Sequence, residues 1–340
     1  MKNPGFLIAR IDRIGDVVLS TALPREIKKK YPESFVAVLV RNYTRDIYLN
    51  NPYVDLIITY DDETGNLKPF WFMRKELSEQ NFSYAFMLLP NERLNYLLFA
   101  TGIKNRIGVG HKLYQFITFT KYVNRKKYNP LRHEADYCLD MIRKIGIDAN
   151  DYTPEIFLTD KEKVIAKNFR KEIIIKQQML IGINVTSGNS APNLPVSEYK
   201  RLIDILKENP NYKVAVIDDR IPESVDNIKS VIYPNRNNTL RISIINLSVF
   251  DLIISSSTGP MHLAAALKVP TLSLFCPLTA CSPKLWGPLG NKSEIIMPSD
   301  TYCATQCPID PKKCDYSKEG GLRAEEVMKK LEFFIDSLKK

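Results

Sequence analysis

Residues 10–32, RIDRIGDVVLSTALPREIKKKYP, decide the fold class together with the apolar runs on either side of them. The run over residues 6–9 predicts a buried strand, the pattern over 17–30 predicts a helix, and residues 35–40 predict the next strand. A strand, a helix and a second strand at this spacing form the βαβ unit of a parallel sheet. The segment therefore predicts an α/β protein.

The same alternation continues along the chain and then restarts. A segment rich in Asp, Asn and Pro at 148–154 predicts a linker, and a charged helix at 161–177 follows it. Beyond this linker the predicted helices lie at 197–207, 222–229, 262–267 and 325–338. We therefore expect two doubly wound domains that face one another across a cleft, over residues 1–160 and 161–322, with a C-terminal helical segment at 323–340.

The length and composition exclude several classes of protein. The chain has 340 residues, of which 44% are hydrophobic and 25% charged, so it is too long for one ordinary core and too apolar for a disordered chain. No run approaches the roughly 18 apolar residues of a membrane span. Arg10, Asp12 and Arg13 interrupt the apolar core that a secretory signal needs. We expect a cytoplasmic protein.

The formal charge of +10 indicates anionic partners such as phosphorylated metabolites, nucleic acid or an acidic lipid surface. No acid occurs between Lys104 and Arg132, and aromatic residues are interleaved there. This stretch is either a solvated surface over buried aromatics or a patch that faces anions or a membrane. The positive charge is the only feature that favours a nucleic-acid-binding protein. The sequence contains no recognisable nucleic-acid-binding module. The eight basic residues are Lys104, Arg106, Lys112, Lys121, Arg125, Lys126, Lys127 and Arg132.

Three of the six cysteines lie close together in the sequence. Cys303, Cys307 and Cys314 have the spacing C-x3-C-x6-C in a loop rich in Pro and Lys. The pattern lacks the paired C-x2-C units of common zinc modules, and no fourth ligand is evident. A structural loop, with or without a disulfide, and a metal site both stay open, and the structural loop is favoured.

Ligands of open parallel sheets bind at the carboxyl ends of the strands, so the loops at these ends are the candidate sites. The first of these loops, residues 11–16, follows the predicted strand at 6–9. In this loop, Gly15 permits a tight turn and close approach of a ligand. Asp16 comes near the start of the following helix, where its carboxylate either caps free N–H groups or points into the cleft. No G-x-G-x-x-G or Walker A pattern is present, which disfavours a dinucleotide dehydrogenase or a P-loop enzyme.

Two further loops rich in hydroxyl residues and glycine follow strands in the second half. Residues 255–262, SSSTGPMH, precede an Ala-rich helix, and residues 185–190, VTSGNS, follow another strand. Free N–H groups and the positive end of a helix dipole suit a diphosphate, and His262 can hydrogen-bond the same anion. The alternative is a helix cap with a partly buried histidine. Together the two loops frame a site for a phosphorylated nucleotide.

At this point the sequence resembles a known family. Residues 10–32, the run STGPMHLAAALKVPTLSLFCP at 257–277 and WGPLG at 286–290 resemble the ADP-heptose:lipopolysaccharide heptosyltransferases of glycosyltransferase family 9. The resemblance implies a GT-B fold of two Rossmann-like domains. The acceptor site is then on the first domain and the nucleotide-sugar site on the second, and the last helix crosses back to the first domain.

The resemblance also implies roles for individual residues. Asp16 matches the proposed catalytic base, while Thr258, Gly259 and His262 match the donor-diphosphate loop. Around them we expect donor-binding residues Thr186, Ser187, Ser257, Pro260 and Met261. Expected acceptor-binding residues are Arg13, Gly15, Lys112, Arg125, Lys126 and Lys127.

The implied activity is inverting, metal-independent transfer of a heptose or related sugar from an ADP-heptose-like donor to an anionic lipopolysaccharide core acceptor, such as Kdo-lipid A or heptosyl-Kdo-lipid A. The enzyme would need no cofactor and would work peripherally at the cytoplasmic surface of the inner membrane. Two departures affect donor binding: Pro192 stands where the family commonly has a basic residue, and Ser257 where it often has an acid. A noncatalytic sugar-nucleotide or glycan-binding protein on the same fold is the alternative.

Overall fold

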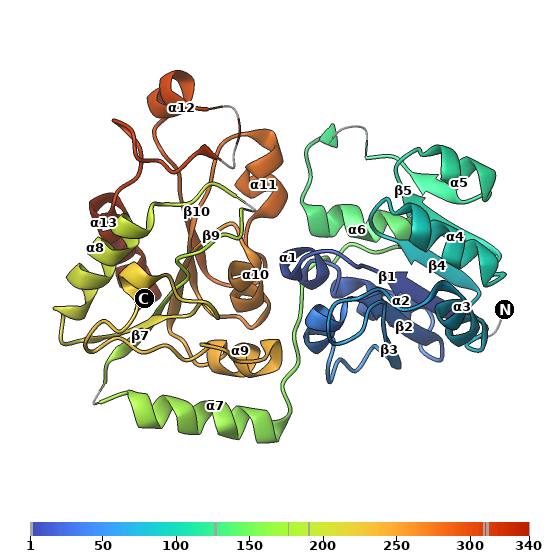
Figure 1. Cartoon of the computed structure of the whole chain (residues 1–340), viewed down its shortest axis with the longest axis horizontal. Coiled ribbons are helices and arrows are strands. Elements are labelled where there is room, and N and C mark those ends of the chain that lie inside the picture. Colours follow the sequence, from blue (N-terminus) through green and yellow to red (C-terminus); the bar gives the residue numbers. More distant parts are fainter. Residues whose placement is uncertain are drawn as a thin grey trace. The chain divides into compact units, whose positions relative to one another are not determined.

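The computed structural model describes residues 3–125, 128–175, 177–189, 191–308, 310 and 313–339. The chain divides into two compact units, Met1–Phe157 and Leu158–Lys340, and each is built around its own parallel sheet (Figure 1). No helix of the described residues is long and apolar enough to cross a membrane.

The first unit contains a six-stranded sheet in the order β3-β2-β1-β4-β5-β6, in which all pairs are parallel. The chain first builds outward from β1 to β3 and then returns to the other side of β1 with β4. The two directions separate between β1 and β4, which places the predicted ligand edge at the carboxyl ends of these two strands. The strands are β1 (Gly5–Ala9), β2 (Phe35–Val40), β3 (Leu56–Thr59), β4 (Tyr84–Met87), β5 (Asn105–Val109) and β6 (Lys121–Val123).

Helices cover both faces of this sheet, which is why β1 is buried along its whole length. Leu7 and Ala9 pack with Met73 and Leu97 in one core cluster, and α3 contacts α4, which contacts α5. Since side chains alternate along a strand, Phe6 and Ile8 point to the opposite face. The helices are α1 (Ile14–Val18), α2 (Ala22–Lys30), α3 (Phe70–Ser78), α4 (Glu92–Ala100), α5 (Leu113–Ile117) and α6 (Glu134–Arg143), with a 3₁₀ helix at Asn42–Ile47.

The second unit contains a five-stranded parallel sheet in the order β11-β10-β9-β7-β8. The order in which the chain adds strands to this sheet reverses between β7 and β9. Within β7, Gly182 is required by close packing, because a Cβ there would lie 2.9 Å from the Phe250 ring. The strands are β7 (Met179–Ile183), β8 (Tyr212–Val216), β9 (Leu252–Ser256), β10 (Thr271–Leu274) and β11 (Ser293–Ile296).

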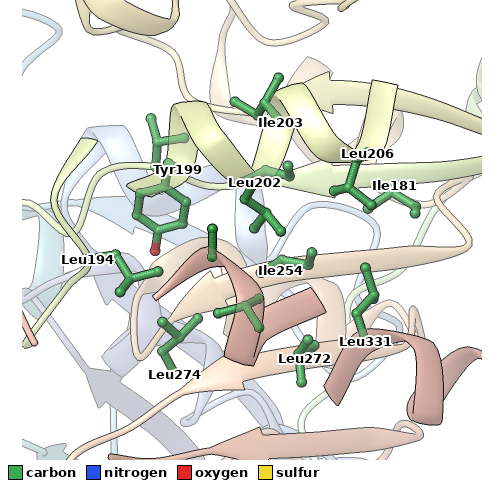
Figure 2. Close-up of a cluster of buried hydrophobic side chains, with 14 of the residues drawn as sticks. Ile181, Leu194, Tyr199, Leu202, Ile203, Leu206, Ile254, Leu272, Leu274 and Leu331 are labelled. Atoms are coloured by element: carbon green, nitrogen blue, oxygen red, sulfur yellow. The ribbon is translucent and has the colours of Figure 1, made fainter. Parts of the chain in front are cut away.

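Several helices of the second unit pack on this sheet through apolar side chains. Figure 2 shows Tyr199, Leu202 and Leu206 of α8 above Ile254, with Leu331 of α13 in the same buried cluster. The helices are α7 (Asp160–Ile173), α8 (Val196–Lys207), α9 (Leu240–Leu247), α10 (Gly259–Ala266), α11 (Pro283–Trp286), α12 (Asp300–Gln306) and α13 (Ala324–Leu338), with 3₁₀ helices at Glu223–Val225 and Thr279–Cys281.

The C-terminal helix corrects one expectation. Helix α13 does not have its apolar face on the first domain, because it packs against α8 and β11 of the second unit. Val327, Leu331, Phe334 and Ile335 are buried in that unit's core. Its exposed side includes Phe333, which is 66% exposed. The helix therefore completes the second unit.

A second correction concerns residues 222–229, for which we predicted a helix. Only the 3₁₀ turn Glu223–Val225 forms, and it buries Val225 alone. One apolar contact does not stabilise a longer helix, since helical segments in proteins depend on a buried face.

The described cysteines favour the structural-loop interpretation. The structure has no disulfide between Cys303 and Cys314, and both side chains are partly buried against the core of the second unit. Within the described ranges, no group of three or more His, Cys, Asp or Glu side chains is arranged to hold a metal ion.

Candidate active site

The carboxyl ends of β1 and β4 carry a cluster of charged side chains centred on the buried Arg10. The Arg10 side chain is 3% exposed, and its guanidinium group lies 2.8 Å from Asp12 Oδ1 and 2.7 Å from Asp16 Oδ1. It also contacts Glu134 Oε1 of α6 at 3.4 Å and donates to the Leu88 carbonyl at 3.2 Å. We call Arg10, Asp12, Asp16, Glu134 and Arg125 the arginine cluster.

Burial and charge act in opposite directions in the arginine cluster. Burial by itself would lower the pKa of Arg10, but Asp12, Asp16 and Glu134 outweigh it and raise that pKa well above its ordinary value. Burial raises the pKa of Asp12 to about 6, and Arg10 opposes the increase. Three carboxylates thus share two guanidinium groups, and the fixed charge of Arg10 holds Asp12 and Asp16 in place.

Asp16 lies in the first turn of α1, but it is not the helix cap. The N-cap residue is Arg13, and no side chain caps this end of the helix. The Asp16 carboxylate instead pairs with Arg10 and stays 20% exposed. Asp16 is therefore a fixed, partly accessible carboxylate at the edge of the sheet where a ligand is expected.

The expected acceptor-binding residues are not all brought to this cluster. Arg13, next to Asp12 in the sequence, is exposed. Gly15 lies inside α1, so the tight turn that we expected at Gly15 does not form. Lys112 is exposed at the start of α5, outside the arginine cluster. Lys126 and Lys127 lie outside the described residues.

Arg125 joins the arginine cluster through Glu134. Its Nη1 donates to both Glu134 carboxylate oxygens, at 2.8 and 2.6 Å. Its Nε and Nη2 are buried and have no hydrogen-bond partner among the described residues. A buried donor without a partner costs free energy, so these two N–H groups are suited to an anionic ligand.

In the second unit, Asp218 organises the carboxyl ends of β7 and β8. Its side chain accepts hydrogen bonds from Asn184 Nδ2 at 2.8 Å, from the Val185 N–H at 2.9 Å, and from the N–H and hydroxyl of Thr186 at 3.0 and 2.5 Å. Burial raises the pKa of Asp218 to about 6, against the effect of the hydrogen bonds from Thr186 and the Val185 N–H. Asp218 thereby fixes the loop after β7.

Asn184 connects this loop to the one after β9. Asn184 Oδ1 accepts from Ser255 Oγ at 3.1 Å and from Thr258 Oγ1 at 3.0 Å. The structure thus brings the two predicted hydroxyl-rich loops together. We call Asn184, Asp218, Ser255, Thr258 and Thr186 the amide–hydroxyl network.

Thr258 is the N-cap residue of α10, yet its side chain does not cap the helix. The hydroxyl is held by Asn184 and Ser255 instead, so the N–H groups of Gly259 and Met261 receive no side-chain cap. Pro260 has no N–H group. An uncapped helix start is a favourable place for an anion.

The remaining expected donor-binding residues differ in accessibility. Ser187, Ser257, Gly259 and Pro260 are partly exposed, whereas Met261 is fully buried, with 0% of the residue exposed. The Met261 side chain is therefore not available to a ligand. His262 is 4% exposed in the same turn, so the expectation of a partly buried histidine understated its burial.

Sequence reasoning missed five members of these clusters. Arg10 and Asp12 stood in the quoted opening motif without an assigned role, and Glu134 is the first acid after the acid-free stretch. Asn184 and Asp218 lie where their strands end, and this position is the signal that could have found them.

The chain is similar to known proteins over most of its length. The model of glycosyltransferase family 9 (heptosyltransferase) matches residues 71–313. Lipopolysaccharide heptosyltransferase 2 of Escherichia coli strain K12 is 23% identical over 303 residues, which cover 83% of this chain and 85% of the relative.

Solved structures match nearly the whole chain. The glycosyl transferase family 9 protein of Veillonella parvula DSM 2008 superposes with a TM-score of 0.79 at 21% identity, covering 99% of each chain. E. coli heptosyltransferase WaaC with ADP superposes with a TM-score of 0.69 at 14% identity, covering 97% of this chain and 99% of its own. The expected GT-B fold is confirmed. Since the family model spans well over half of the residues, this chain is a glycosyltransferase that belongs to family 9, the heptosyltransferase family.

Proposed function

We propose that the protein transfers a heptose or related sugar from an ADP-linked donor to a lipopolysaccharide core acceptor, with inversion at the anomeric carbon. The observation that carries this proposal is Asp16, a partly exposed carboxylate held by Arg10 at the ligand edge of the first sheet. In a family 9 chain, such a carboxylate is suited to general-base catalysis.

In this mechanism, Asp16 accepts the proton of an acceptor hydroxyl while that oxygen attacks the anomeric carbon. The bond from this carbon to the nucleotide diphosphate breaks in the same step, and the diphosphate leaves with its electron pair. A positioned general base contributes about 10²- to 10⁴-fold in rate. Arg10 keeps the carboxylate in one orientation through the 2.7 Å contact.

The donor is assigned to the amide–hydroxyl network and the start of α10. The Gly259 N–H and the positive end of the α10 dipole, together with His262, would stabilise the negative charge on the leaving diphosphate without a metal ion. Thr186, Ser187 and Ser257 would complete the donor site. That the E. coli WaaC structure carries ADP supports an adenosine diphosphate donor.

The acceptor is assigned to the first unit, where Arg125 offers two buried N–H groups to an anion. A Kdo or heptosyl-Kdo core carries the carboxylate and phosphate groups that a guanidinium binds well. Arg13, Lys112, Lys126 and Lys127 would add positive charge around it. Because this acceptor is anchored in lipid, the enzyme would work peripherally, at the cytoplasmic surface of the inner membrane.

The experiment is a panel of nucleotide sugars scored by diphosphate release with a lipid A core acceptor. We expect release with an ADP-heptose-like donor only when the acceptor is present. If the protein binds a nucleotide sugar but releases no diphosphate with any combination of donor and acceptor, the noncatalytic alternative is favoured. Release with a different sugar would retain the mechanism and correct the donor.

A further inference from the structure

Helix α5, labelled in Figure 1, and the segment after it carry several large apolar side chains that are exposed. Phe116 and Phe119 are 80% and 82% exposed, and Leu113 is 75% exposed. Ile117 and Tyr122 add to the same short segment at 53% and 42%. We call Leu113, Phe116, Ile117, Phe119 and Tyr122 the apolar tip.

The polar side chains of this segment point inward instead. Gln115 and Thr118 are 2% and 1% exposed. Gln115 Nε2 donates to the Val109 carbonyl at 3.1 Å, and Asn95 of α4 donates to Thr118 Oγ1 at 2.7 Å. Thr120 completes this inner network by donating to Asn95 Oδ1 at 3.0 Å. Hydrogen bonds to the protein thus fix the apolar tip in its outward orientation.

This arrangement reverses the usual pattern of a helix on a protein in water, in which the apolar side chains face the core. Contiguous exposed apolar patches of this kind mark interaction surfaces. Phe119 also adopts a left-handed backbone with φ of 54°, a costly conformation for a bulky residue. The inner hydrogen bonds hold the chain there although Gly or Asn would fit more easily.

The charges along the segment that carries the apolar tip are of one sign. Lys104, Lys112 and Lys121 are exposed, and within the part of the chain that the structure describes they form no ion pair. By contrast, Arg125 and Arg132 pair with acids of α6. No Asp or Glu occurs between residues 104 and 132. The rim of the tip is therefore suited to an anionic partner.

We propose that the apolar tip docks onto an anionic lipid bilayer, with its aromatic and aliphatic side chains inserted at the headgroup boundary and Lys104, Lys112 and Lys121 among the lipid headgroups. Apolar side chains ringed by lysines are the chemistry that such an interface selects. This inference rests on the proposed function in one respect, since a lipid-anchored acceptor gives the enzyme a reason to be at a membrane.

The test is flotation of the purified full chain with vesicles of phosphatidylcholine that contain roughly a quarter phosphatidylglycerol. The variant Phe116→Ser/Phe119→Asn should lower the partition coefficient at least about tenfold. Phe333→Ser is the matched control, because Phe333 is also an exposed phenylalanine near a lysine, Lys330, but lies on the second unit. It should leave the partition coefficient unchanged.

Two further measurements separate the possible occupants of the tip. Lys112→Glu/Lys121→Glu should weaken binding to anionic vesicles, and binding by the wild type should decrease with salt. A wild type that does not float, or a Phe116/Phe119 variant that floats like the wild type, would overturn the proposal. So would a variant that changes the oligomeric state but not flotation, because the tip would then bind a second copy.

Turnover with a delipidated, water-soluble core acceptor keeps this proposal distinct from the proposed function. The Phe116/Phe119 variant should turn over this acceptor at the wild-type rate. Loss of that activity would assign the tip to the acceptor site and overturn membrane docking. Failure of heptose transfer in the wild type would overturn the proposed function, while flotation would still test the tip.

Discussion

Each of the two units places an aspartate just beyond the carboxyl end of a sheet strand, but the two units hold it by different means. Asp12 in the first unit and Asp218 in the second both follow sheet strands, and burial raises the pKa of each to about 6. Asp12 is held by the guanidinium of Arg10. Asp218 is held by two backbone N–H groups and the side chains of Asn184 and Thr186.

The difference indicates what each unit is suited to do. The arginine cluster fixes charges, which is what a carboxylate needs if it is to accept a proton in one defined orientation. The amide–hydroxyl network fixes loops and uses the Thr258 hydroxyl internally. It therefore leaves the start of α10 uncapped for a ligand.

The largest effect should come from Glu134, because it is the buried carboxylate between two arginines. Glu134→Ala leaves Arg10 and Arg125 without this partner and should lower the free energy of unfolding by about 3–5 kcal/mol. Asn184→Ala breaks only hydrogen bonds and should cost about 1–3 kcal/mol. Urea denaturation measures both, and Glu134→Gln is the isosteric control. Equal losses for Glu134→Ala and Asn184→Ala would remove the contrast between the units.

The next effect concerns Asp218 and pH. Its folded pKa of about 6 lies above the usual value of 3.8, so its stabilising contribution is complete below about pH 4 and lost as pH rises through 6. The difference corresponds to about 3 kcal/mol. Asp218→Asn should therefore gain stability relative to the wild type by up to that amount between pH 4 and 7. A stability difference that is constant with pH would contradict the assignment.

Asp16→Ala should lower turnover at least about 100-fold, or about 2.7 kcal/mol in the activation barrier, with donor affinity nearly unchanged. Asp12→Ala is the matched control, because Asp12 pairs with the same guanidinium. It should reduce turnover less, since only the position of Arg10 changes. A variant of Asp16 that unfolds more easily but turns over normally when folded would show a purely structural role.

Much of the fold and part of the site could be predicted from local patterns. The apolar run before Arg10 and the hydroxyl-rich loop at 255–262 both marked strand ends, and the structure places them there. Glu134 could not be found in this way, because it meets Arg10 across 124 residues of sequence. Local periodicity also left open where α13 packs, since an amphipathic helix has an apolar face whichever unit receives it.

The smallest effect concerns nucleotide binding to the second unit. If the start of α10 receives a diphosphate, ADP at roughly ten times its Kd should stabilise the protein by about 1.4 kcal/mol and raise the Tm by a few degrees, and AMP should do so less. Pro192 supplies no charge to the donor, so the affinity should be lower than in relatives with a basic residue there. Asp16→Ala should show the same ADP effect as the wild type, because it alters the other unit. Calorimetry could instead give equal heats for ADP and AMP, and no heat with any nucleotide sugar. The uncapped start of α10 would then not be a donor site. The contrast between the two units would then not reflect a division between catalysis and donor binding.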